Sequence, residues 1–155
     1  MAGNDPFQVF RFLVEVENSG VVVAAFSQFS GIRMEVQTVQ GRSGDDPRGV
    51  QSYIPVLTSF APVTLTKGVI GDNDFLDWMF SAAAGAYDGP SDKSLRRTLN
   101  IVALDSQGRR GVTWTLHNAL PIGYELAPMD GSRSEVLSES LTFAIEGMER
   151  KTETV

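Results

Sequence analysis

Apolar and polar residues alternate along most of this chain, with the period of two that is typical of a β-strand with one buried face. The first such stretch covers residues 10–17, where phenylalanine and valine alternate with mostly polar residues. A turn at residues 18–20 precedes the expected return strand of a hairpin, residues 21–26. Similar patterns predict further strands at residues 32–40, 53–57, 63–67, 98–104, 112–117, 122–126 and 137–145.

One segment instead has the period of an α-helix. Residues 71–74 combine a capping sequence with acidic side chains that favour a helix N-terminus. The apolar residues that follow at helical spacing are Phe75, Leu76, Met79 and Phe80. Gly85 is a natural stop. The sequence therefore predicts one short amphipathic helix, which packs on a β framework.

Seven or eight strands joined mostly by turns, with one helix, predict a mainly β fold. We expect two packed antiparallel sheets, arranged as a sandwich or barrel, with one short α-helix. The chain of 155 residues shows neither a repeat nor a second domain, so residues 1–155 are expected to form a single domain. A domain of this size buries roughly two-thirds of the surface that its unfolded chain exposes, so it can be stable without disulfides or other cross-links.

Residues 41–50 interrupt this pattern. They hold three glycines, one proline and four charged residues, a composition that predicts an exposed loop. The loop is long for a hairpin connection, and such loops often contact partners. A solvated loop without a function is an equally good interpretation of this composition.

Composition limits the function. The chain has no cysteine, which excludes disulfides and thiolate chemistry, and its net charge of −6 disfavours binding to nucleic acid through phosphates. No apolar run approaches the ~20 residues that a membrane helix needs, and no secretory signal is visible. We expect assembly in the cytoplasm and no insertion into a membrane.

No residue pattern indicates catalysis. The single histidine, His117, has no neighbouring partner in the sequence for a metal site or a triad. Asp72 and Asp74 resemble the start of a calcium loop, but the later glycine and glutamate that such a loop requires are missing. Glu135 and Glu139 are expected on solvated faces. We therefore predict a protein that is not an enzyme and that needs no cofactor or metal.

Several predicted strands pair an apolar face with one of small hydroxyl residues, as at Thr64 and Thr66. Antiparallel sheets with one wet face have this pattern. In one interpretation the chain is a monomeric β-sandwich that binds a small ligand or carbohydrate. In the other, the wet face lines a channel shared between subunits. Trp78 and Trp114 are both expected in the core, which leaves few aromatic residues for a ligand pocket.

Seven segments in order resemble the phage tail tube protein family, which includes tube subunits of contractile tails and of extracellular contractile injection systems. One is the glycine-rich loop at residues 41–50. The other six are DPFQVFRFLVEVE, VAAFSQFSGIRMEVQTV, YIPVLTSFAPVTLTKGVIGDNDFLDWMF, RRTLNIVALDSQGR, WTLHNALPIGYELAPMD and SEVLSESLTFAIEGMER. The resemblance runs nearly end to end, and it implies an Hcp-like tail tube fold.

The resemblance also implies an assembly. Members of this family form hexameric rings around a lumen, and the rings stack helically into a tube, usually inside a contractile sheath. The implied partners are further copies of the chain, the sheath protein, baseplate and cap proteins, and a lumen cargo of DNA or effector protein. The particle would be a virion tail or an extracellular or cell-associated injection system.

Two sets of residues follow from the resemblance. The positions implied to face the lumen are Arg33, Glu35, Gln37, Thr64 and Thr66. The positions implied to contact a neighbouring subunit or ring are Arg42, Ser43, Asp45, Asp46, Arg48 and Tyr53. A lumen of hydroxyls and carboxylates would not hold a polyanion, because like charges repel over about a Debye length, ~8 Å at physiological salt.

Overall fold

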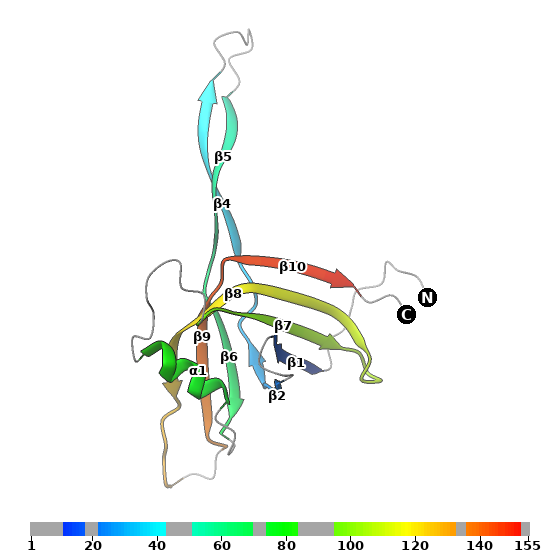
Figure 1. Cartoon of the computed structure of the whole chain (residues 1–155), viewed down its shortest axis with the longest axis vertical. Helices are drawn as coiled ribbons and strands as arrows, with labels where there is room; N and C mark the ends of the chain where they lie inside the picture. The colour runs from blue at the N-terminus through cyan, green and yellow to red at the C-terminus, as the bar shows by residue number, and fades with distance from the viewer. Residues whose placement is uncertain are drawn as a thin grey trace.

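The computed structural model describes residues 11–17, 22–42, 51–69, 74–83, 95–132 and 136–152. Within these residues the chain forms ten strands and one helix, coloured in order in Figure 1. The elements are β1 (Arg11–Val16), β2 (Val22–Ala25), β3 (Gln28–Phe29), β4 (Met34–Arg42), β5 (Gln51–Phe60), β6 (Val63–Gly68), α1 (Asp74–Ala83), β7 (Arg97–Leu104), β8 (Arg110–Leu126), β9 (Ser138–Ala144) and β10 (Gly147–Thr152).

Two antiparallel sheets share the long strand β8. The first part of β8 pairs with β7 and β10, and its last residues pair with β9. We call β2, β1, β7, the first part of β8 and β10 sheet A, and the last part of β8, β9, β6 and β3 sheet B. The register shifts between Pro121 and Gly123, where β8 passes from one sheet to the other. The mainly β fold with two antiparallel sheets and one helix is confirmed.

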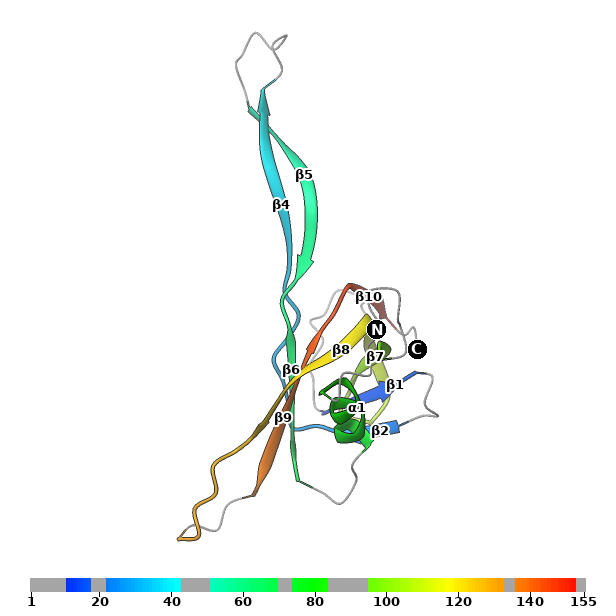
Figure 2. The ribbon, with the colours of Figure 1, turned by 60° about the vertical axis from the view of Figure 1, so that its left-hand side comes forward.

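Strands β4 and β5 pair only with each other and form a two-stranded ribbon, here called the arm. The arm stands away from the rest of the molecule (Figures 1 and 2). It is longer than the sequence predicts, because β4 runs through Arg42 and β5 begins at Gln51. The predicted loop therefore keeps only residues 43–50, which lie outside the described residues.

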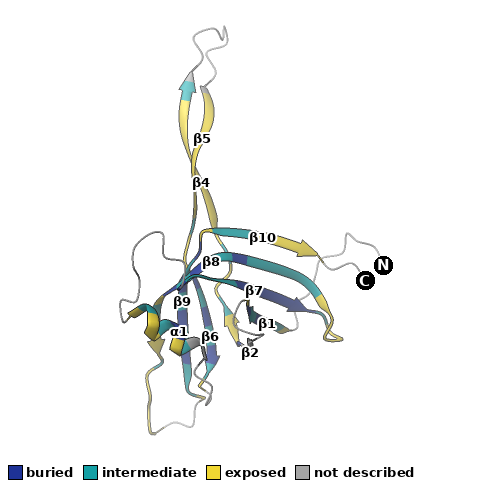
Figure 3. Ribbon diagram, in the orientation of Figure 1, coloured by how far each residue is buried: buried dark blue, intermediate teal, exposed yellow. Residues whose placement is uncertain are grey.

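The core lies between sheets A and B, where buried residues of β6 and β9 meet those of β1, β7 and β8 (Figure 3). Along β6 the buried residues alternate with half-buried ones, so Val63 and Leu65 point inward while Thr64 and Thr66 lie on the other face. The predicted period of two therefore corresponds to one buried face of sheet B.

Helix α1 contributes Trp78 to this core. The indole Nε1 donates a hydrogen bond to the carbonyl oxygen of Leu95 at 2.6 Å, and the ring lies 5.1 Å from that of Phe143. Trp78 is confirmed as a core residue, whereas Trp114 is only partly buried. The predicted helical face is partly wrong, because Phe80 is 59% exposed and Trp78 takes the central position.

Strand β10 is missing from the sequence-based prediction, which ended the last strand at Ile145. The chain turns at Glu146, whose carboxylate lies 2.7 Å from the Arg96 guanidinium and accepts a hydrogen bond from the Asn118 amide at 3.1 Å. Asn118 has a positive φ of 54°, which asparagine tolerates better than most residues. β10 then returns along β8 with few apolar side chains, so no alternation marked it in the sequence.

A buried ion pair contradicts one expectation. Glu139 was expected on a solvated face, but it is 3% exposed and its Oε1 lies 3.9 Å from the equally buried Nζ of Lys67. Tyr124 donates a hydrogen bond to Glu139 Oε2 at 3.0 Å. Burial raises the pKa of Tyr124, and this carboxylate raises it further. Charges without contact to water require such partners.

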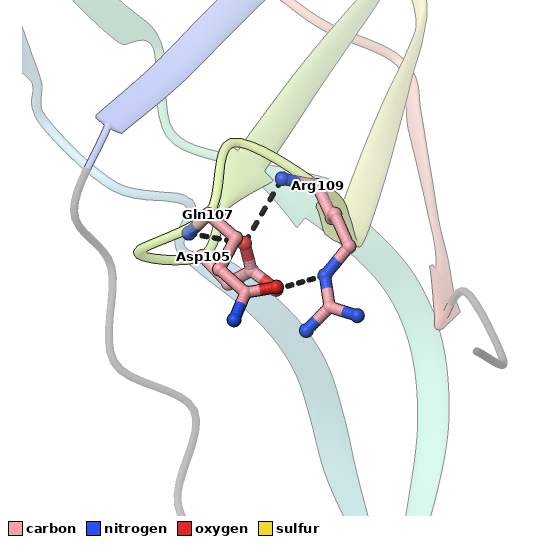
Figure 4. A network of polar contacts seen from close by, with 3 residues as sticks. All are labelled: Asp105, Gln107 and Arg109. Carbon is pink, nitrogen blue, oxygen red and sulfur yellow. Dashed lines mark hydrogen bonds and ion pairs between the residues drawn. The ribbon is translucent and has the colours of Figure 1, made fainter.

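The β7–β8 hairpin turn is held by Asp105 (Figure 4). Its Oδ1 accepts hydrogen bonds from the backbone N–H groups of Arg109 and Gln107, both at 2.9 Å, and its Oδ2 accepts one from Arg109 Nε at 3.1 Å. The Arg109 backbone N–H contributes most to a pKa of Asp105 that is lower than its ordinary value of 3.8. Gly108 follows with a φ of +78°, and the predicted turn is confirmed.

The Asp105 turn should make stability depend on pH. Folding lowers the pKa of Asp105. Its contribution to the free energy of unfolding is therefore present above pH 3.8 and is lost as the pH falls through the lower pKa of the folded state. Asp105→Asn should therefore reduce the free energy of unfolding at pH 7, and its difference from the wild type should shrink near pH 3. Urea unfolding at both pH values measures this. Gln107→Ala, which keeps the backbone donor, should leave the pH dependence unchanged, and an equal effect of both variants would contradict the assignment.

Removing Glu139 should destabilise the domain strongly. Glu139→Ala leaves Lys67 buried without this carboxylate, and breaking a buried pair in this way costs about 3–5 kcal/mol. Glu125→Ala, which removes an exposed glutamate from β8, should change the free energy of unfolding by less than ~0.5 kcal/mol. Urea unfolding compares them, and a cost for Glu139→Ala no larger than that for Glu125→Ala would show that the pair is not needed.

Candidate assembly surfaces

The outer face of sheet B is a ladder of hydroxyl groups. Thr64 Oγ1 lies 3.1 Å from Thr142 Oγ1, and Thr66 Oγ1 lies 2.8 Å from Ser140 Oγ. These side chains are half-buried and occupy the face opposite the core. Because the hydroxyls bond to each other across the strands, they are largely satisfied, and this face is polar. Its one charged neighbour among the described pairs is Glu125 of β8, the cross-strand partner of Ser140.

The five predicted lumen positions fall into two groups. Thr64 and Thr66 belong to β6 in sheet B, whereas Glu35 and Gln37 belong to β4 in the arm, and Arg33 directly precedes that strand. Arg33 forms an exposed ion pair with Glu35. The structure therefore places these positions on two sheets of one chain and leaves the prediction that they share a lumen untested.

The arm exposes an unusual amount of apolar surface (Figure 3). Its large apolar side chains with about half or more of their surface exposed are Met34, Val36, Val39, Tyr53, Ile54, Val56 and Leu57. A two-stranded ribbon buries little by itself and is marginally stable in water. Contiguous apolar surface of this kind marks an interaction site. Sequence analysis missed it, because alternation along β4 resembles that of any half-buried strand.

Two of the predicted contact positions lie in the described part of the arm. Arg42 ends β4, and Tyr53 of β5 is 69% exposed, with its hydroxyl accepting a hydrogen bond from Gln40 Nε2 at 3.4 Å. The other four lie outside the described residues, and they are Ser43, Asp45, Asp46 and Arg48.

A groove of about 930 Å³ opens at the edge of the body, beside β3. Its apolar lining comes from both sheets and the segment after β3, as Phe12, Phe29, Ile32, Ile101, Trp114 and Met148. No residue that lines it is charged. The partial exposure of Trp114 follows from its position in this groove. The sequence carried no signal for the groove, since its lining comes from distant segments.

The described residues offer little chemistry. Among them, no group of three or more histidines, cysteines, aspartates or glutamates is placed to hold a metal ion. Nor is any helix in that part of the chain long and apolar enough to cross a membrane. His117 is partly exposed, with Nε2 3.4 Å from Glu149 Oε1, a surface ion pair when the ring is protonated.

The fold is found in solved structures of injection machines. A chain in the cryo-EM structure of the anti-feeding prophage baseplate superposes with a TM-score of 0.77 at 20% identity, over 96% of this chain and 97% of that one. A chain in the PVC sheath–tube complex, an extracellular contractile injection system, gives 0.76 at 20% identity, over 97% and 95%. Hcp1 from Flavobacterium johnsoniae gives 0.60 at 12% identity, over 93% and 97%.

The sequence itself decides the family. No curated protein matches it. A family profile described as T4-like virus tail tube protein gp19 matches residues 8–149, which is nearly the whole chain. This match does not favour the alternative prediction of a monomeric ligand-binding sandwich. With the predicted resemblance confirmed, the chain belongs to the T4-like virus tail tube protein family.

Proposed function

We propose that this chain is an inner tube subunit whose copies close into hexameric rings, and that these rings stack helically into a tube. The observation that carries the proposal is the arm, an exposed apolar ribbon whose two strands pair only with each other among the described residues, in a member of a tail tube family. The arm, including Tyr53, and the segment 43–50 that joins its two strands in the sequence contact neighbouring subunits or rings.

Open sheet edges favour the same assembly. Within the described residues, β2, β3 and β10 each pair with a strand on one side only. Exposed strand edges invite pairing with other chains, and closing sheets into a barrel removes them. In a closed ring of identical subunits, the strand edges of every copy are paired in the same way.

The hydroxyl ladder of sheet B faces the lumen in this assembly. Thr64, Thr66, Ser140 and Thr142 carry no charge, and the charges of Arg33 and Glu35 at the base of the arm offset each other. Such a wall has no cluster of cations to hold a polyanion, and DNA or an effector protein could slide past it. The wall performs no reaction and needs no cofactor.

The tube belongs to a larger particle, either a phage tail or a contractile injection system, assembled in the bacterial cytoplasm. Its partners are the sheath protein outside the tube and baseplate and cap proteins at its ends. Chains of the same fold in the sheath–tube complex, the baseplate and the tube-terminating cap support these partners. The final location is the virion tail or an extracellular or cell-associated particle.

Assembly itself tests the proposal. Mixed with its baseplate components, the wild-type protein should form rings or tubes that negative-stain microscopy detects. Deleting residues 42–48 should abolish tube growth because the predicted contact residues are lost, while urea unfolding of the monomer should change little because the core of the described residues lies in the sheets and the helix.

A glycine–serine segment of equal length in place of residues 42–48 separates the two roles of this segment. If it restores growth, only the length of the connection matters, and if it does not, the native side chains make the contact. A wild-type protein that stayed a compact monomer at high concentration and never added to a baseplate-primed tube would refute the proposed function.

A further inference from the structure

The two strands of the arm place their apolar residues on different faces in different halves. Cross-strand partners share a face of a ribbon. In the half next to the body, Met34 pairs with Phe60 and Val36 lies on the same face, while Glu35 and Gln37 lie on the opposite face. At the base of the arm the Met34–Phe60 face is therefore mainly apolar and the other face mainly polar, with Thr58 and Leu57 as the exceptions.

In the outer half the two faces exchange character. Val39 pairs with Ile54, and both lie on the face that was polar at the base. The other face there carries Thr38, Gln40 and Tyr53, and the Tyr53 hydroxyl accepts a hydrogen bond from Gln40. The apolar residues have therefore moved from one face of the ribbon to the other.

The change occurs at a β-bulge. The register shifts between Gln37 and Thr38, where Val56 is the extra residue of β5. Val56 and Leu57 are both more than half exposed and connect the two apolar groups. A bulge increases the right-handed twist of its strands, and two-stranded ribbons twist strongly. β4 and β5 indeed wind around each other along the arm (Figures 1 and 2).

Apolar residues follow one another along the described arm. They run from the Met34–Phe60 pair through Val36 and Val56 to the Val39–Ile54 pair, and they change face at the bulge. None of these residues has a charged cross-strand partner.

Only the inner end of this apolar series is covered by its own chain. Phe60 packs against the core, whereas Val39 and Ile54 are 50% and 49% exposed. The Val39–Ile54 pair lies five residues farther along β4 than the Met34–Phe60 pair, about 17 Å at ~3.4 Å per residue. The outer apolar group is thus held away from its own body.

The groove beside β3 is the matching surface. It contains no charged residue and lies in the body from which the arm projects. Its lining is mainly apolar and also includes the uncharged polar residues Ser27, Gln28, Ser30, Thr64 and Thr66. A volume of about 930 Å³ is at the upper end for ligand pockets and accommodates several side chains of one strand. The outer end of the arm and the groove can pack together without burying a charge that lacks a partner.

We propose that the Val39–Ile54 end of one subunit's arm docks in the β3 groove of another subunit, with Val39 and Ile54 facing it. This inference rests on the proposed function and adds the surface that receives the arm. The contact is heterologous, because the arm and the groove are different surfaces of the subunit. In an open row of subunits, one end therefore has a free arm and the other end has a free groove. Such contacts close into rings or continue as a helix.

Engineered cysteines test the contact directly, because the chain has none of its own. Val39→Cys protein is mixed with Gln28→Cys protein, assembled on baseplates and oxidised. Gln28 is exposed and lines the groove. A non-reducing gel should show a covalent dimer. The matched control is Thr38→Cys with Gln28→Cys, since Thr38 is exposed and adjacent to Val39 but lies on the opposite face of β4. We expect at least tenfold less dimer from the control.

The outcomes separate this inference from the proposed function. Tubes that form without a Val39–Gln28 dimer, or with equal dimer from Thr38, would overturn the docking and leave the tube function intact. A cross-link within a single chain carrying both cysteines would show that the arm occupies its own groove, which also overturns the proposal. Failure of the wild type to form tubes would instead count against the proposed function.

Charge substitutions give a second measurement. Val39→Asp should abolish tube growth, because docking would bury an unpaired carboxylate in the groove. Thr38→Asp should assemble normally. Urea unfolding of both monomers should resemble the wild type, since both positions are exposed. Normal assembly of Val39→Asp would refute the docking.

Discussion

One long strand, β8, holds the two sheets of this domain together. Its first part belongs to sheet A and its last part to sheet B, with the transition at Pro121–Gly123. The approach of the strands is tight there, since a Cβ on Gly123 would lie 3.3 Å from Thr142 Cβ. Because β8 continues through the transition, the buried faces of both sheets meet in one core and the hydroxyl ladder points away from it. The hydroxyl ladder takes its orientation from this transition.

Most strands were predictable from sequence because one face is buried and the other is not. β6 and β9 follow the period of two closely, and Trp78 could be placed in the core from its helix. The failures have a common cause. Glu139 is buried beside Lys67, which comes from a strand that is distant in the sequence. β10 has few apolar residues of its own and is held by its pairing with β8. Contacts between distant segments leave no local period in the sequence.

The assembly surfaces were predictable only in part. Thr64 and Thr66 were recognised as a wet face from their alternation, and the structure places them on one hydroxyl ladder. The arm was not recognised, because Met34 and Val36 alternate with polar residues just as core-facing residues do. Burial inside the same chain and burial against a neighbour use the same residue types. Only the three-dimensional structure shows that β4 leaves the body of the subunit.

The exposed arm also has a consequence for the free subunit. Before incorporation it carries apolar surface that other copies can bind at random, which is the condition for aggregation. A net charge of −6 opposes such encounters and keeps dilute subunits apart. Growth from a preformed end, where several contacts form at once, is then favoured over spontaneous nucleation. The geometry of the arm thereby links the solubility of the subunit to control over where a tube begins.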